Sequence, residues 1–206
     1  WYNFSLKNNT CDLVFDRKEI VIPAGMELVR ASLSSSQKFL TMELRPYQEK
    51  VNKDKKEEEI KPDKSFELEL WTWDEYEVPT LQTRSRYSHP QYSKYIYDIA
   101  SQKLTEVAPG YADLLEPDRA EEIHYVLYTD ETPYRSQKDW LNEMPFDIYS
   151  VNVHTGEKQL VGRSYRTRPR WSMNGKWAVM YDPIAQVWNK FDGKTGEVTD
   201  ISTAIG

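Results

Sequence analysis

The chain contains three histidines, the side chains that most readily bind a metal or exchange a proton near neutral pH. His89, His124 and His154 lie far apart in the sequence and lack the close spacing of zinc-ligand motifs. His154 also falls in an expected hairpin turn, where a second copy of that hairpin has Lys7. Solvated or structural roles are therefore predicted for the histidines, with no metal and no cofactor.

One serine lies in a string that partly matches a nucleophile elbow. Such an elbow needs Gly-x-Ser-x-Gly, so that the chain can turn tightly with the serine exposed between a strand and a helix. The string Gly162-Arg163-Ser164-Tyr165-Arg166 has Arg166 in place of the second glycine, and no helix is expected after it. Ser164 is therefore not predicted to be a nucleophile, and no catalytic residue is assigned.

The remaining reactive groups do not form a recognisable constellation. Cys11 is the single cysteine, so an intramolecular disulfide is excluded and the redox compartment stays undecided. A small core residue on a strand is the favoured interpretation of Cys11. No two carboxylates can be placed across a cleft as in a glycosidase, and no Gly-rich phosphate loop is present.

Two aromatic clusters are the candidate binding surface. Trp71 and Trp73 lie at the end of one expected strand, and Tyr134, Arg135 and Trp140 share one loop. Aromatic residues and arginine are enriched at binding hot spots. Packing between sheets is the competing interpretation of these aromatic residues.

Composition excludes several classes of function. The net charge is -6 and the basic residues are mixed with acidic ones, which argues against binding nucleic acid through phosphate contacts. No apolar run is long enough to span a membrane. The first residues lack a basic segment followed by an apolar one, so no signal peptide is expected in this chain. A periplasmic or extracellular location stays open.

The elements that must position these residues are β-hairpins. Arg170 to Ile201 reads as one four-stranded unit, with tight turns at Asn174-Gly175 and Thr195-Gly196. Asn-Gly and Thr-Gly supply the positive φ that tight hairpin turns require. The 14 tyrosines and 7 tryptophans also suit pleated, half-buried strands.

These hairpins recur along the chain. Thr155-Gly156 and Thr195-Gly196 lie 40 residues apart, close to the repeat of about 40–45 residues in a four-stranded propeller blade. The alignments are Trp1 to Val14 on Ile148 to Val161, Tyr95 to Val107 on Asn189 to Ile201, and Leu33 to Leu40 on Trp171 to Ala178. The alternative is that these are unrelated hairpins, since any all-β chain has hairpins with polar turns. The fixed order in which the paired hairpins recur argues against it.

The predicted fold is all-β, a partial β-propeller of about three four-stranded antiparallel blades plus half a blade in one domain. The predicted units are a half blade over 1–23, a blade over 24–108 with a charged insertion at 48–65, a blade over 109–162 and a blade over 163–206. Both ends supply the last two strands of a blade, so they cannot complete each other. The remainder of a parent chain, or a second copy, is therefore expected to cover the open sheet edges.

Trp171-Ser172-Met173-Asn174-Gly175-Lys176-Trp177 resembles the W-S-P-D-G-K-aromatic repeat of TolB-like propellers and of relatives of prolyl oligopeptidase and dipeptidyl peptidase IV. Met173-Asn174 replaces Pro-Asp, and Ser35-Ser36-Gln37 replaces Pro-Asp-Gly in the earlier copy. Further stretches are similar to the propeller of bacterial S9-family serine peptidases. They are Leu70-Trp71-Thr72-Trp73 with Leu81-Gln82, Asp130-Glu131-Thr132-Pro133-Tyr134-Arg135, and Tyr181-Asp182-Pro183 with Lys194-Thr195-Gly196.

The resemblance implies a propeller that caps an α/β-hydrolase domain and limits access to its active site, with the catalytic Ser, Asp and His in that other domain. The chain is accordingly predicted to be a non-catalytic segment of an S9-type serine peptidase. The alternative is an independent TolB-like scaffold that binds protein or peptide. Glu121-Glu122 is similar to a glutamate pair that binds a substrate amine in dipeptidyl peptidase IV relatives, but the surrounding motif is absent and a solvated turn is favoured.

Overall fold

The computed structural model describes residues 2–5, 10–13, 20–47, 92–117, 120–137 and 141–202. These residues form β-strands and one short 3-10 helix, η2 (Thr132–Gln137). Near the N-terminus, β1 (Tyr2–Ser5) and β2 (Thr10–Leu13) pair as a two-stranded antiparallel sheet. The expected strand Phe66 to Trp73 and the charged insertion 48–65 lie outside the described residues.

Three four-stranded antiparallel sheets make up the rest of the described chain, and in each sheet the strands follow one another in sequence order. The first sheet is β3 (Met26–Leu33), β4 (Phe39–Pro46), β5 (Ser93–Asp98) and β6 (Lys103–Ala108). The second is β7 (Asp113–Leu115), β8 (Tyr125–Asp130), β9 (Phe146–Asn152) and β10 (Lys158–Tyr165). The third is β11 (Arg170–Trp171), β12 (Trp177–Asp182), β13 (Val187–Asp192) and β14 (Val198–Asp200).

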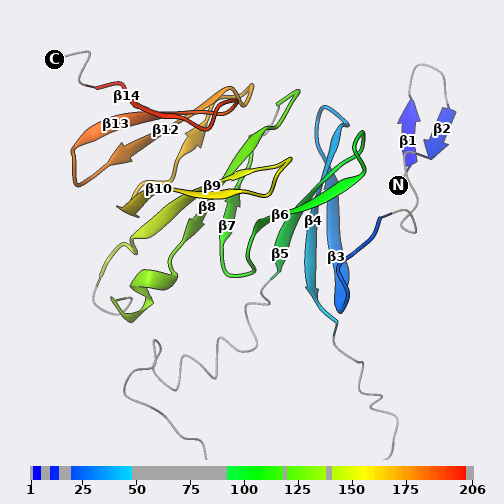
Figure 1. Cartoon of the computed structure of the whole chain (residues 1–206), viewed down its shortest axis with the longest axis horizontal. Coiled ribbons are helices and arrows are strands. Elements are labelled where there is room, and N and C mark those ends of the chain that lie inside the picture. Colours follow the sequence, from blue (N-terminus) through cyan, green and yellow to red (C-terminus); the bar gives the residue numbers. More distant parts are fainter. Residues whose placement is uncertain are drawn as a thin grey trace, which may run out of the picture.

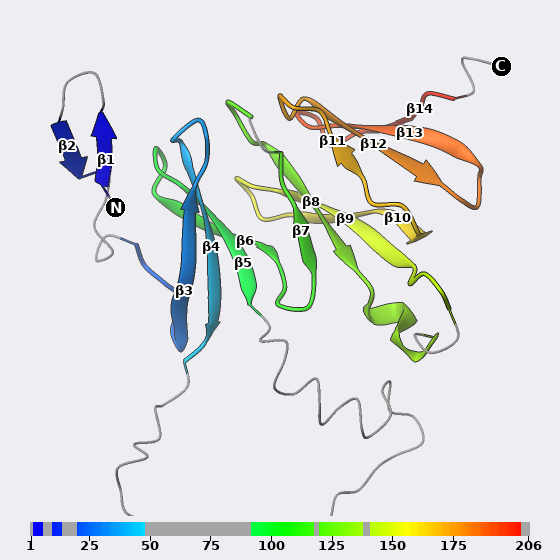
Figure 2. The same ribbon diagram turned by 180° about the vertical axis from the view of Figure 1, so that it is seen from behind.

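The sheets stand next to one another in the order of the sequence, as Figures 1 and 2 show from opposite sides. One core cluster joins the first and second sheets and includes Phe39, Ile96 and Val126. Another joins the second and third sheets and includes Leu127 and Phe191. Alternate residues of β8 therefore face opposite neighbours, as the two-residue period of a strand requires. The predicted all-β partial propeller is confirmed.

The turns between the last two strands of the second and third sheets are built alike. In one, the Asn152 side-chain oxygen accepts hydrogen bonds from the amides of His154 and Thr155; in the other, Asp192 accepts them from Lys194 and Thr195. Gly156 and Gly196 follow with φ of +81° and +77°. The 40-residue repeat in the sequence thus corresponds to a repeated turn geometry.

The first hairpins of the first and third sheets also have turns of the same geometry. The Ser34 hydroxyl accepts the amide of Phe39 at 3.2 Å, and the Ser172 hydroxyl accepts the amide of Trp177 at the same distance. Gln37 has φ +58° where the other copy has Gly175 at +69°. Phe39 and Trp177 therefore occupy equivalent positions in their sheets.

Some element ends differ from the sequence expectation. The sequence also predicts a strand over Ile123 to Thr129, and this strand, β8, begins at Tyr125 and ends at Asp130. β10 runs on to Tyr165, past the predicted end of its unit at 162, because register shifts on either side of Gly162 extend the pairing with β9. The loop expected after Asp130 contains η2.

Candidate functional site

The predicted binding surface is only partly within the described residues. Trp71, Trp73 and Trp140 lie outside them, so their part of the prediction stays a prediction. Tyr134 and Arg135 lie on η2, between β8 and β9, and both are half-buried.

The Tyr134 hydroxyl is used inside the protein. It donates a hydrogen bond to Oδ1 of Asp147 at 2.5 Å, and the same carboxylate oxygen accepts the amide of Ser164 at 3.1 Å. Burial and the bond to Asp147 raise the pKa of Tyr134. Tyr134 therefore fastens η2 to β9 and β10. The binding role of Tyr134 and Arg135 stays a prediction.

The string around Ser164 has the geometry of a strand. Ser164 lies near the end of β10 with φ +57°, at a register shift, and the next element is strand β11. A nucleophile elbow instead places its serine between a strand and a helix. This string therefore lacks the local structure of an elbow.

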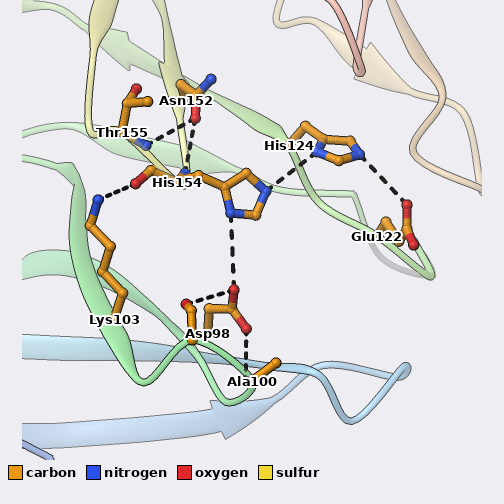
Figure 3. A network of polar contacts seen from close by, with 9 residues as sticks. Asp98, Ala100, Lys103, Glu122, His124, Asn152, His154 and Thr155 are labelled. Atoms are coloured by element: carbon orange, nitrogen blue, oxygen red, sulfur yellow. Dashed lines mark hydrogen bonds and ion pairs between the residues drawn. The ribbon is translucent and has the colours of Figure 1, made fainter.

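The structure brings together two histidines that sequence spacing had separated. Nδ1 of His124 and Nε2 of His154 are 3.3 Å apart, and the ring centroids are 5.4 Å apart. Each ring also has a carboxylate near its other nitrogen, Glu122 beside His124 at 3.6 Å and Asp98 beside His154 at 3.9 Å. Figure 3 shows the resulting row of four side chains, which we call the histidine row.

Strand pairing explains why the two rings meet. Tyr125 pairs with Asn152 at the end of β8 and β9, and the Val153 amide continues the pairing by donating to the His124 carbonyl at 2.9 Å. His154 is the next residue, in the turn held by Asn152. Pairing of β8 with β9 thus makes neighbours of two histidines that are 30 residues apart in the sequence.

The first sheet contributes the far end of the row. Asp98 ends β5, where its carboxylate accepts the amide of Ala100 at 3.0 Å and the hydroxyl of Ser101 at 2.9 Å. Lys103, at the start of β6, donates to the His154 carbonyl. The row therefore bridges the first and second sheets at the end where their hairpin turns gather (Figure 3).

Two pockets flank the histidine row. One, of about 390 Å³, lies between the first and second sheets and includes Phe39, Asp98 and His154 in its lining. The other, of about 410 Å³, lies toward the third sheet and includes Glu121 and Lys176. Glu122 and His124 line both pockets. The histidines therefore stand between two hollows that carry charges of both signs.

The chemistry of the row is that of imidazole nitrogens placed close together. Such nitrogens accept or donate protons and bind transition metals. Within the described residues, no group of three or more His, Cys, Asp or Glu side chains has the geometry of a metal site. Among the same residues, no helix is long and apolar enough to cross a membrane.

Comparison with solved structures finds a distant likeness. No family model and no curated protein matches the chain. The crystal structure of TolB from Acinetobacter baumannii matches with a TM-score of 0.35 and 11% sequence identity, over 98% of this chain. The chain spans 37% of the length of that TolB chain. At these values the likeness does not by itself assign a function.

Proposed function

We propose that the chain is a non-catalytic β-propeller segment whose third sheet docks a further four-stranded sheet. The docking face is defined by Trp177, Val179, Tyr181, Trp188 and Lys190, on the side of β12 and β13 away from the second sheet. Ala178, Met180 and Phe191 point the other way, into the core shared with the second sheet. Trp177 and Trp188 are 41% and 48% exposed, which is high for side chains of this size.

The first sheet supports this proposal because several of its equivalent positions contact the second sheet or the residues that flank β7. Phe39, the counterpart of Trp177, is buried in the core between the first two sheets. Thr41 corresponds to Val179, and its hydroxyl donates to Glu116 at 2.7 Å. Lys94 corresponds to Trp188, and its ammonium donates to the Ala112 carbonyl at 2.9 Å. The same positions on the third sheet therefore suit a fourth sheet as occupant.

The chemistry of the docking face favours an apolar, β-structured partner. Tyr181 and Trp188 pair across β12 and β13 with ring centroids 5.3 Å apart, which places them on one face. Large aromatic side chains dominate interface energetics because each buries a large apolar area. Contiguous exposed apolar patches of this kind mark interaction sites.

The resemblance to S9-type peptidases supports a finer proposal. In it, the docked sheet is the next blade of a longer peptidase chain, and the propeller filters substrates for a hydrolase domain. The reading frame that follows Gly206 in the gene tests this version. A downstream Gly-x-Ser-x-Gly with later Asp and His codons would support it, and an immediate stop codon would refute it in favour of an independent scaffold.

The docking proposal is tested on the isolated chain by sedimentation velocity over a range of concentrations. With no further sheet present, we expect the docking faces of two copies to associate through Trp177 and Trp188. Trp188→Lys should weaken this association at least tenfold, because a buried lysine charge without a partner is costly. Met173→Lys is the matched control, since Met173 is 70% exposed but lies in the β11–β12 turn.

Monomeric behaviour of the wild-type chain at about 100 μM, well above a micromolar dissociation constant, would argue against the docking face. Equal weakening by Met173→Lys and Trp188→Lys would place the contact elsewhere.

A further inference from the structure

The two ring nitrogens at the centre of the histidine row have the spacing of two ligands of one metal ion. Nδ1 of His124 and Nε2 of His154 are 3.3 Å apart. Two nitrogens at about 2.0–2.1 Å from a tetrahedral zinc ion are themselves about 3.3–3.4 Å apart. We propose that these two nitrogens bind one divalent transition-metal ion, with Zn²⁺ as the expected ion and water in the remaining positions. This proposal is independent of the docking face.

The outer nitrogen of each ring has a carboxylate nearby, at ion-pair distance. In metal sites, the nitrogen that does not bind the metal commonly donates to a carboxylate, which fixes the tautomer and the ring orientation. Here Glu122 lies 3.6 Å from Nε2 of His124, and Asp98 lies 3.9 Å from Nδ1 of His154. The two inner nitrogens share one hydrogen bond at 3.3 Å, so an ion that binds both must take the place of the proton between them.

The backbone under the rings is held by hydrogen bonds. The His154 amide is bound to Asn152, and the His124 carbonyl accepts the amide of Val153. Asp98 is fixed by the turn that it caps, and its side chain is only 16% exposed. Glu122 is more exposed and also lies 3.9 Å from the Lys38 ammonium. Asp98 is therefore the better-ordered of the two carboxylate partners.

The ligand set selects the class of metal. Imidazole nitrogens suit zinc, copper and nickel, whereas calcium and magnesium prefer oxygen ligands. The described residues supply two ligands to the ion and offer no cluster of three. A site with half the ligands of a four-ligand structural zinc site is expected to have about half its binding free energy. This corresponds to a dissociation constant for zinc of roughly 1–100 μM. Open coordination positions beside the two pockets would leave the bound ion accessible to a carboxylate or imidazole of a partner.

Isothermal titration of zinc chloride into the 206-residue chain tests the proposal. We expect one zinc ion per chain, with binding weakened at least tenfold in His124→Ala and in His154→Ala. Asp98→Asn should weaken binding by about tenfold, because it removes the carboxylate that orients His154 while leaving both ligands in place. His89→Ala and Cys11→Ser are the matched controls, since they remove the third histidine and the single cysteine, and both should bind zinc like the wild type.

Absence of zinc binding up to about 1 mM would overturn the proposal. Wild-type affinity in either His124→Ala or His154→Ala would overturn it as well, and so would loss of binding in His89→Ala. If the alanine variants do not fold, as judged by circular dichroism, the test is made by NMR on the wild-type chain instead. Zinc must then shift the ring resonances of His124 and His154 in NMR spectra, and unshifted rings would refute the site.

Discussion

Replacing Gly175 by alanine tests how the third sheet is fastened to the second. Gly175 lies in the β11–β12 turn with φ +69°, a conformation that costs a residue with a Cβ roughly 1–2 kcal/mol. A Cβ at this position would lie 2.6 Å from Cβ of Ala120 and 2.9 Å from Cβ of Pro117. Both atoms belong to the connection between β7 and β8, so the added methyl group would push the two sheets apart.

The size of the effect follows from these two terms. Neither an alanine methyl group nor a proline ring can rotate out of the way, so the backbone must move, and overpacking of this kind costs about 1–3 kcal/mol. Together with the strain in φ, Gly175→Ala should lower the free energy of unfolding by about 2–5 kcal/mol.

Gly25→Ala is the matched control. Gly25 has φ +78°, but a Cβ there would meet nothing within 4 Å. The strain in φ and the change in unfolded-chain entropy are therefore shared by the two variants, and they cancel in the comparison. Urea denaturation should show Gly175→Ala to be less stable than Gly25→Ala by about 1–3 kcal/mol. Equal stability would refute the packing of the third sheet's first turn on the second sheet.

The remaining predictions concern the core and pH. Phe191→Ala should cost about 3–5 kcal/mol in urea denaturation, because Phe191 is fully buried edge-on to Tyr125 and Trp171; a cost below about 1 kcal/mol would contradict the shared core. Burial, then the nearby Tyr149, raises the pKa of Tyr128. The contribution of Tyr128 to the free energy of unfolding is complete below the pKa of about 10 that a tyrosine has in the unfolded chain. Above that pH the unfolded chain loses the proton first, so this contribution falls by up to about 1.4 kcal/mol per pH unit. Tyr128→Phe should flatten this alkaline loss relative to wild type, and an unchanged alkaline loss in this variant would contradict the burial of Tyr128.

Much of the fold could be predicted because the turns are local. Asn174-Gly175 and Thr195-Gly196 fix tight turns through φ and nearby side-chain oxygens, and these causes lie within a few residues of each other. The repeat of such turns is what indicated stacked four-stranded sheets. Strand ends were predicted less well: β10 reaches Tyr165 through register shifts that depend on its pairing with β9, which no short window of sequence contains.

The histidine row could not be predicted from spacing. Zinc motifs are recognised when ligands are close in sequence, whereas His124 and His154 meet only because β8 and β9 pair and the turn after β9 folds back. Alignment of the hairpin copies placed His154 in a turn, which the structure bears out. A strand register for β8 and β9 would have been the missing signal, because it makes His124 and Val153 neighbours. Tyr134 and Arg135 remain a predicted surface that the structure does not test.

The central claim is that the outward side of the third sheet is made to be covered by another sheet. Hydroxyl-radical footprinting of the chain at increasing concentration measures this directly, side chain by side chain. We predict that labelling of Trp177 and Trp188 falls as the chain associates while labelling of Met173, exposed in the turn, stays constant. Association without protection of the two tryptophans, or equal protection of Met173, would contradict the claim.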